Sequence, residues 1–199
     1  MVVMNSFFRI AAGLLIAWLP LVASAHEALR IKPLAERKVT ELPAGTLVWA
    51  IEAFDSVAAA KTAEGPWSLV VESEGKVWLF SLTNPGARSA SGTPVTEVGP
   101  IPRISAGTYL LRVNDASGPP GSVTPIHKHP GSEAFFVLSG EQSIRSASKV
   151  MTVTAGHTEP GQGAENAMEV SSSGSVDLHA LVMFVVDADK PFSSPATLP

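Results

Sequence analysis

Residues 121–140 read GSVTPIHKHPGSEAFFVLSG, and this stretch decides the fold. His127 and His129 are two residues apart, so both imidazole rings point to the same face of an extended segment. Pro130-Gly131 then turns the chain, and Glu133 begins the next predicted strand, from which its carboxylate can return to that face. The spacing therefore predicts two nitrogens and one carboxylate converging from adjacent strands, a donor set typical of a metal site with open coordination positions.

The same stretch resembles the first conserved motif of the cupin superfamily. Gly121 is followed by five residues and then by His127-Lys128-His129, with three more residues to Glu133 and six more to Gly140, which matches every fixed position of that motif. The resemblance implies a jelly-roll barrel, or double-stranded β-helix, with these three ligands inside. It also implies a divalent transition metal (Fe, Mn, Ni or Zn) and dioxygenase or isomerase chemistry on a small molecule.

The second cupin motif is degenerate in this chain. Its usual pattern is a Pro-x-Gly turn, two residues, a histidine as the fourth ligand, and then three residues that are often followed by Asn. The comparable stretch, residues 161–174, reads GQGAENAMEVSSSG and places Met168 at the histidine position and Ser172 at the Asn position. A thioether is a poor ligand for a hard divalent ion, so we expect the fourth protein ligand to be missing.

Two other histidines are candidates for the site. His157 follows Gly156 at a predicted turn, where it either reaches the metal or is a surface histidine. His179 lies in the last predicted strand, in phase with Leu181 and Met183, and we favour a core histidine bonded to a backbone carbonyl over a ligand. The three-ligand set also leaves open a barrel with a vestigial site that binds no metal.

The composition is that of a globular protein without thiol chemistry. The 199 residues are 45% hydrophobic and 16% charged, which provides ample apolar area for a core. A formal net charge of −4 without a long basic run argues against nucleic-acid binding. The chain has no cysteine, so thiolate ligands and thiol catalysis are excluded.

The first 25 residues are predicted to be a signal peptide. Arg9 precedes an apolar run over residues 10–19, Pro20 ends that run, and Ala23-Ser24-Ala25 supplies small residues at the cleavage positions. The run is short for a membrane span and no second run follows, although an uncleaved anchor is the alternative. We therefore expect an exported protein, periplasmic or extracellular, with no membrane span after cleavage.

The mature chain is predicted to be all-β, a cupin jelly roll with extra N-terminal strands and one short helix. Residues 26–116 are expected to supply N-terminal strands and a long loop over 84–106, 117–190 the cupin core, and 191–199 a tail. Within the first of these segments we predict a polar arm over 27–45, a strand at 47–53, a short helix capped by Asp55 and a hairpin of 67–72 with 76–82. A further strand is predicted over 108–113. Because residues 117–187 supply only six or seven strands and a jelly roll needs about eight, the N-terminal segment is expected to complete the barrel rather than form a degenerate second one.

The sequence leaves more than one function open. The first is a metal-dependent enzyme that acts on a small molecule at the open coordination positions. The second is a non-catalytic, exported module that binds a small molecule or a metal. A structural barrel that forms a homodimer through its sheet edges is the third.

Overall fold

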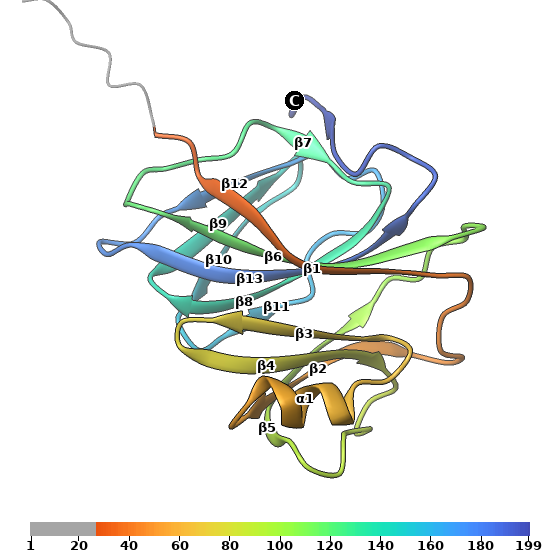
Figure 1. Ribbon diagram of the computed structural model, residues 1–199. Coiled ribbons are helices and arrows are strands. Elements are labelled where there is room, and N and C mark those ends of the chain that lie inside the picture. Colours follow the sequence, from red (N-terminus) through yellow and green to blue (C-terminus); the bar gives the residue numbers. More distant parts are fainter. Residues whose placement is uncertain (1–26) are drawn as a thin grey trace, which may run out of the picture.

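The computed structural model describes residues 27–199, so the predicted signal peptide lies outside the described residues. The described chain forms two five-stranded sheets, one four-stranded sheet and one short helix (Figure 1). We call the three sheets the shared, opposite and outer sheets.

The shared sheet contains, in spatial order, β1 (Arg30–Val39), β6 (Tyr109–Gly118), β13 (Leu178–Asp187), β8 (Gly131–Ser139) and β11 (Thr158–Glu159). The opposite sheet contains β10 (Val150–Thr154), β9 (Glu141–Ser146), β12 (Met168–Ser172), β7 (His127–Lys128) and β14 (Ser194–Pro195). The outer sheet contains β3 (Ser68–Ser73), β4 (Lys76–Thr83), β2 (Leu47–Phe54) and β5 (Thr93–Ile101).

The shared and opposite sheets face each other and enclose the barrel core, as the predicted jelly roll requires. Ile144 and Val170 from the opposite sheet pack in one buried cluster with Phe135, Val137 and Val182 from the shared sheet. All pairs of neighbouring strands in the three sheets are antiparallel. The predicted all-β jelly roll with extra N-terminal strands and one short helix is therefore confirmed.

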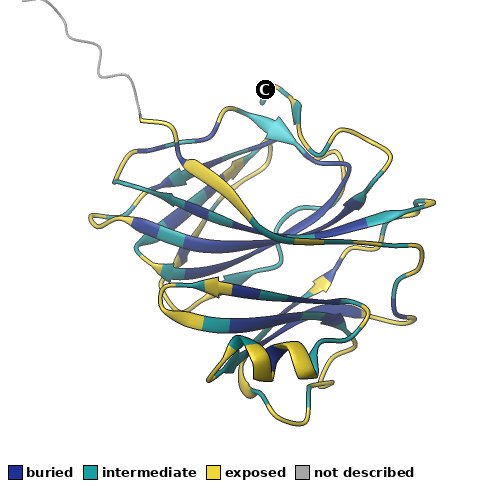
Figure 2. Cartoon of the chain, viewed as in Figure 1, coloured by how far each residue is buried: buried dark blue, intermediate teal, exposed yellow. Residues whose placement is uncertain are grey.

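The shared sheet is covered on both faces, which explains the unbroken apolar sequence of β13. Its even-numbered residues, including Val182 and Phe184, face the barrel core, whereas Leu181, Met183 and Val185 pack against the outer sheet. A strand that is buried on both faces has no solvent side and therefore no polar alternation. Figure 2 shows the contrast with edge strand β1, much of which is exposed.

The N-terminal segment is divided between two sheets. β1 and β6 pair with each other, and β6 pairs with β13, so both belong to the barrel wall. β2, β3, β4 and β5 form the outer sheet, which lies on the back of that wall; Trp78 of β4 meets Phe136 of β8 edge to face at a centroid distance of 5.9 Å. Helix α1 (Val57–Ala63) contacts β2, β3 and β4 at the outside of the molecule (Figure 1).

Three local expectations differ from the structure. The N-cap of α1 is Ser56 rather than Asp55, because the Ser56 hydroxyl accepts a hydrogen bond from the Ala59 amide at 3.2 Å. The predicted loop over 84–106 contains β5, an edge strand that tolerates prolines because one side of its backbone needs no sheet partner. The predicted arm over 27–45 contains β1, whose mostly exposed side chains give no alternating signal.

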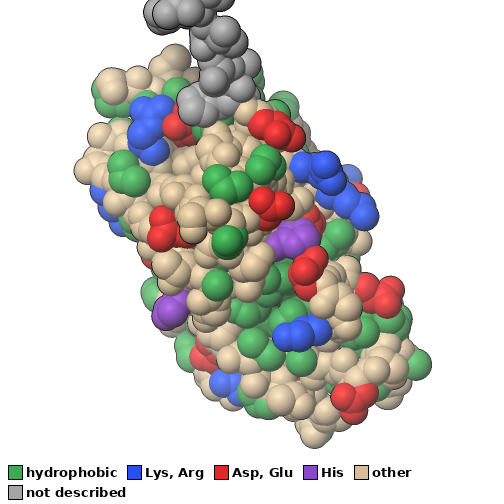
Figure 3. All heavy atoms as spheres, turned by 90° about the vertical axis from the view of Figure 1, so that its left-hand side faces the viewer, with side chains coloured by type: hydrophobic (Ala, Val, Ile, Leu, Met, Phe, Trp, Pro, Cys, Tyr) green, Lys and Arg blue, Asp and Glu red, His purple; other side chains and the backbone are tan. Residues whose placement is uncertain are grey.

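The surface carries charges of both signs. Figure 3 shows Lys and Arg side chains scattered among acidic ones over one face of the molecule. Within residues 27–199, no helix has the length and hydropathy needed to cross a membrane.

Gly131 lets the start of β8 approach β13 closely, in the turn between the histidines and Glu133. A Cβ atom at this position would lie 2.1 Å from the Val185 carbonyl oxygen and 2.5 Å from the Val186 Cα. Both of these atoms are backbone, so a side chain could be accommodated only if the two strands separated.

We predict that Gly131→Ala lowers the free energy of unfolding by about 1–3 kcal/mol, the usual cost of overpacking a rigid contact. Chemical denaturation measures the change. Gly65→Ala is the matched control, because its Cβ would meet only the Ser68 hydroxyl at 3.5 Å, and it should change stability by less than about 0.5 kcal/mol. Equal losses in the two variants would contradict the close approach at Gly131.

Candidate metal centre

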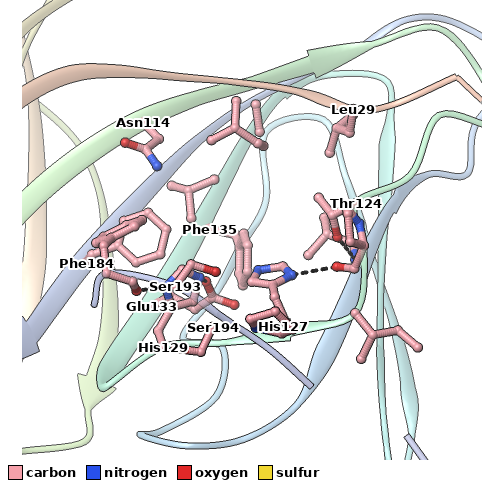
Figure 4. A pocket seen from close by; sticks show the side chains of 18 residues that line it. Leu29, Asn114, Thr124, His127, His129, Glu133, Phe135, Phe184, Ser193 and Ser194 are labelled. Atoms are coloured by element: carbon pink, nitrogen blue, oxygen red, sulfur yellow. Dashed lines mark hydrogen bonds and ion pairs between the residues drawn. The ribbon is translucent and has the colours of Figure 1, made fainter. Parts of the chain in front are cut away.

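Two consecutive strands, β7 and β8, bring the predicted ligands together. His127 lies in β7, His129 directly precedes the turn at Pro130, and Glu133 is the third residue of β8. One ligand atom from each of the three side chains lies within 4.8 Å of the other two. Two atoms that each lie about 2.0–2.2 Å from one ion are at most about 4.4 Å apart, so these side chains need to move together by only a few tenths of an ångström to hold a divalent ion. Figure 4 shows the three side chains converging at one part of a cavity.

The backbone fixes the orientation of both imidazole rings. The Nδ1 atom of His127 lies 2.8 Å from the Pro125 carbonyl oxygen, and that of His129 lies 2.6 Å from the Phe192 carbonyl oxygen. A carbonyl only accepts hydrogen bonds, so each Nδ1 carries the proton, and a neutral ring then has its lone pair on Nε2. Both histidines thus present a metal-binding Nε2, with the second nitrogen held in the way that is usual for metal ligands.

Glu133 is a buried carboxyl group without a compensating partner. Its side chain is 3% exposed, and its Oε1 atom has no hydrogen-bond partner within the described residues. Its Oε2 atom lies 3.4 Å from Nε2 of His129. Burial raises the pKa of Glu133 to about 8 and lowers the pKa of His129 to about 4, so without a cation both groups are neutral at pH 7 and do not form an ion pair.

A divalent cation would supply what this group of side chains lacks. It would pair with the ionised Glu133 carboxylate and accept the Nε2 lone pairs of both histidines. It would also lie beside Oε1, which has no hydrogen-bond partner among the described residues. The donor set of two nitrogens and one oxygen suits Fe, Mn, Ni or Zn and leaves coordination positions open. The side chains present therefore fit a transition metal.

The site opens into a cavity of about 420 Å³ inside the barrel. Most of the lining is apolar, and its aromatic members are Phe135, Phe184 and Phe192. Within residues 27–199, the ionisable side chains that line it are the three predicted ligands: His127, His129 and Glu133. The three candidate ligands thus form the ionisable part of a mostly apolar cavity.

The C-terminal residues form part of the site. Ser194 and Pro195 form β14, which pairs with Lys128 and His127 of β7. The Phe192 ring lies 4.8 Å from the His129 ring and 4.9 Å from the Phe184 ring, and its carbonyl accepts the His129 hydrogen bond. We call residues 190–196 the C-terminal strap.

The strap and Asn114 were not predicted from the sequence. The strap was expected to be a tail, and no motif marks Phe192. Asn114 of β6 lines the cavity and is 2% exposed. The alternation of side chains along β6 could have placed Asn114 on the core-facing side, because it lies in phase with Leu110 and Ala116. It was missed because the predicted strand ended at Val113.

The other three candidate residues lie outside the cavity lining. Met168 is buried in the barrel core and pairs in register with His127, but it does not line the cavity. His157 is exposed at a turn, where its Nδ1 lies 3.1 Å from the Ala155 carbonyl oxygen. Within residues 27–199 the group of potential ligands that could hold a metal is His127, His129 and Glu133.

His179 differs from the expected core histidine. It is partly exposed, with Nδ1 2.7 Å from Glu74 and Nε2 3.0 Å from Asp115, and neither of these partners is a backbone carbonyl. The reason is the turn between β3 and β4, which brings Glu74 of the outer sheet to the shared sheet beside His179. His179 therefore joins two sheets rather than filling the core.

The two facing antiparallel sheets with the predicted ligands between them form the jelly-roll barrel that the sequence resemblance implied. The structure is similar to a cupin-like protein from Thermotoga maritima, with 16% sequence identity and a TM-score of 0.40 over 44% of this chain and 65% of that chain. It is also similar to a conserved protein with a double-stranded β-helix domain from Klebsiella pneumoniae, with 21% identity and a TM-score of 0.38 over 44% of this chain and 75% of that one.

A third similar structure is an oxalate oxidase in complex with the substrate analogue glycolate. The identity is 22% and the TM-score is 0.34 over 42% of this chain and 45% of that chain. No protein-family model matches the chain, and neither does any curated protein.

The buried Glu133 makes the stability of the metal-free protein depend on pH. Its folded pKa of about 8 lies above the ordinary value of 4.5, so the stability contributed by the neutral form is lost as the pH rises through 8. The burial of neutral His129 has the opposite effect on the pH dependence of stability. Its folded pKa of about 4 lies below the ordinary value of 6.5, so the stability contributed by its neutral form is fully present above pH 6.5 and is lost as the pH falls through 4.

We predict that the melting temperature of the chelator-treated protein falls between pH 6.5 and 8, and that Glu133→Gln removes this contribution to the fall. Thermal unfolding followed by circular dichroism in EDTA measures both slopes. An identical slope in the wild type and in Glu133→Gln would show that the Glu133 carboxyl group is not the cause.

The strap is predicted to hold His129 in place for metal binding. Phe192→Ala removes the ring that packs on His129 and Phe184 and loosens the segment whose carbonyl accepts the Nδ1 hydrogen bond. Loss of such outer partners usually weakens metal binding about 10- to 100-fold, and we expect a loss in this range. Competition with a chromophoric chelator for Zn(II) measures it. The exposed Thr197→Ala is the control, and equal Zn(II) affinities in the two variants would refute the role of the strap.

Proposed function

We propose that this protein is an exported metal-binding cupin in which His127, His129 and Glu133 hold one divalent transition metal. The observation that carries the proposal is the orientation of both rings. Each Nδ1 is committed to a backbone carbonyl, so both Nε2 atoms are left for the space beside a buried carboxylate that has an unpartnered oxygen. Export is proposed from the sequence of residues 1–25 alone.

The proposed activity is metal-dependent conversion of a small molecule held in the cavity. When bound, the metal would supply Lewis acidity or, if it is redox-active, oxygen activation at its open positions. The protein supplies the chamber: its apolar wall excludes water and strengthens electrostatic interactions at the site. Glu133 and the two histidines hold the ion at one place on that wall.

The cavity favours oxidation over proton-transfer isomerisation. In the part of the chain that the structure describes, the ionisable side chains of the lining are the three ligands, and no separate acid or base lies there to move a proton between substrate carbons. Dioxygenase chemistry does not depend on such a group. Of the two activities that the cupin resemblance implies, we therefore propose the oxygen-dependent one.

A second candidate function is a non-catalytic module that binds a small molecule at the metal. It is favoured by the same feature of the cavity, the lack of an acid or base besides the three ligands among the described lining residues. A chamber without an acid or base can serve binding alone. Edge strand β1 would be available for association of two copies in either case. Oxygen consumption by the Fe(II)-loaded protein with a bound ligand favours the enzyme, and a ligand-induced thermal shift without turnover favours the module.

We predict that the purified protein contains close to one transition-metal ion per chain after growth with iron, manganese, nickel and zinc supplied. Elemental analysis measures the content. The double variant His127→Ala/His129→Ala should be empty yet folded, because both side chains contribute to the site rather than to strand pairing. The matched double variant His157→Ala/His179→Ala should retain the metal, since neither residue lines the cavity. If the wild type and the first variant carry equally little metal, the proposal fails.

A further inference from the structure

Few polar side chains line the cavity, and they lie on different parts of its wall. Apart from the ligand set, the polar side chains in its lining are Asn114, Thr124, Ser193 and Ser194. Ser193 and Ser194 belong to the C-terminal strap, and the Thr124 hydroxyl already accepts a hydrogen bond from the Val170 amide at 3.0 Å. Asn114 is therefore the polar side chain of the inner wall, away from the strap, that no protein group engages.

Asn114 is buried without a partner within the described residues. It is 2% exposed, and its Oδ1 atom has no hydrogen-bond partner there. An unsatisfied buried amide is unfavourable, and such groups are rare in folded proteins. Asn114 lines the cavity, so a ligand inside it can bond the end of the amide that faces it, which is the nitrogen as placed or the oxygen after the two are exchanged (Figure 4).

Strand register places Asn114 at a distance from the metal ligands. Asn114 of β6 pairs with Val182 of β13, which pairs with Phe135 of β8, and Phe135 is two residues beyond Glu133. Two strand spacings across the sheet and two residues along it separate the Cα atoms of Asn114 and Glu133 by about 10–12 Å. Since both side chains point into the barrel, a small molecule can span the gap between them.

The volume and lining of the cavity define the rest of such a molecule. About 420 Å³ equals the volume of about 14 water molecules in the liquid, enough for a ring with a short chain. Between Asn114 and the ligand set the wall is formed by apolar side chains such as Phe135, Val182 and Phe184. An additional hydroxyl, phosphate or carboxylate held against this apolar part of the wall would find no polar side chain there to bond to, at a cost in affinity.

We propose that the cavity selects a small, largely apolar molecule with one metal-binding oxygen group at one end and one hydroxyl group, recognised by Asn114, at the other. A hydroxyl both donates and accepts, so it satisfies the Asn114 amide in either orientation of its oxygen and nitrogen. The inference rests on the proposed function, because the first contact of the ligand is with the metal. Sugars, sugar acids and phosphorylated compounds are outside the selected class.

The test compares three carboxylates on the Zn(II)-loaded protein by isothermal titration calorimetry. The probes are phenylacetate, 4-hydroxyphenylacetate and gluconate. We expect 4-hydroxyphenylacetate to bind about tenfold more tightly than phenylacetate, because only the former satisfies Asn114, and gluconate to show no measurable binding. Equal affinities for the two aromatic probes, or binding of gluconate as tight as theirs, would overturn the inference.

Asn114→Leu is the direct variant, because leucine keeps the shape of the side chain and removes its polar atoms. We expect this variant to bind the two aromatic probes equally and to melt at a higher temperature than the wild type without ligand. Gln142→Leu is the matched control: Gln142 is also a fully buried amide with unpartnered atoms, but it does not line the cavity. It should keep the wild-type preference.

Zn(II) affinity is measured first in every variant, so that a failure of metal binding can be distinguished from a failure of ligand recognition by Asn114. Absence of Zn(II) binding in the wild type overturns the proposed function. Normal Zn(II) binding with the preference for 4-hydroxyphenylacetate unchanged in Asn114→Leu overturns only the role of Asn114. Asn114→Ser provides a second variant should the leucine variant not fold, and its discrimination should fall in the same direction.

Discussion

The carboxyl group of Glu133 is the constraint around which the site is organised. It is buried in the barrel wall, one of its oxygens has no partner within the described residues, and its nearest basic neighbour is a histidine whose own pKa is lowered by burial. A protein interior does not tolerate such a group without compensation. The two Nε2 atoms beside it point to the same compensation, a cation shared by all three side chains.

The architecture keeps that group dry and fixed. β8 carries Glu133 in the shared sheet, with the opposite sheet and the strap on the side of the site and the outer sheet behind. The strap adds the Phe192 carbonyl, which orients His129, and the Phe192 ring, which packs on it. The extra N-terminal strands therefore serve the site indirectly, by covering the back of the sheet from which Glu133 projects.

The sequence predicted what local spacing determines and missed what depends on distant packing. His127 and His129, two residues apart, and Glu133 after a turn share a face for reasons of strand geometry, so the ligand set could be predicted from the residues themselves. The jelly roll was implied by the resemblance of the same stretch to the cupin motif. The role of Phe192 and the partners of His179 depend on segments 63 and about 105 residues away, which no periodicity reveals. β1 was missed because its exposed side chains do not alternate, and Asn114 because the predicted strand ended at Val113, five residues before the end of β6.

The most direct test of the central claim is anomalous X-ray diffraction from crystals of the Zn(II)-loaded protein. The account predicts one strong peak inside the barrel, at about 2.0–2.2 Å from Nε2 of His127, Nε2 of His129 and a carboxylate oxygen of Glu133. Nδ1 of both histidines should remain on the backbone carbonyls of Pro125 and Phe192. A fully loaded crystal without a peak at this position, or with Zn(II) bound only elsewhere, would contradict it.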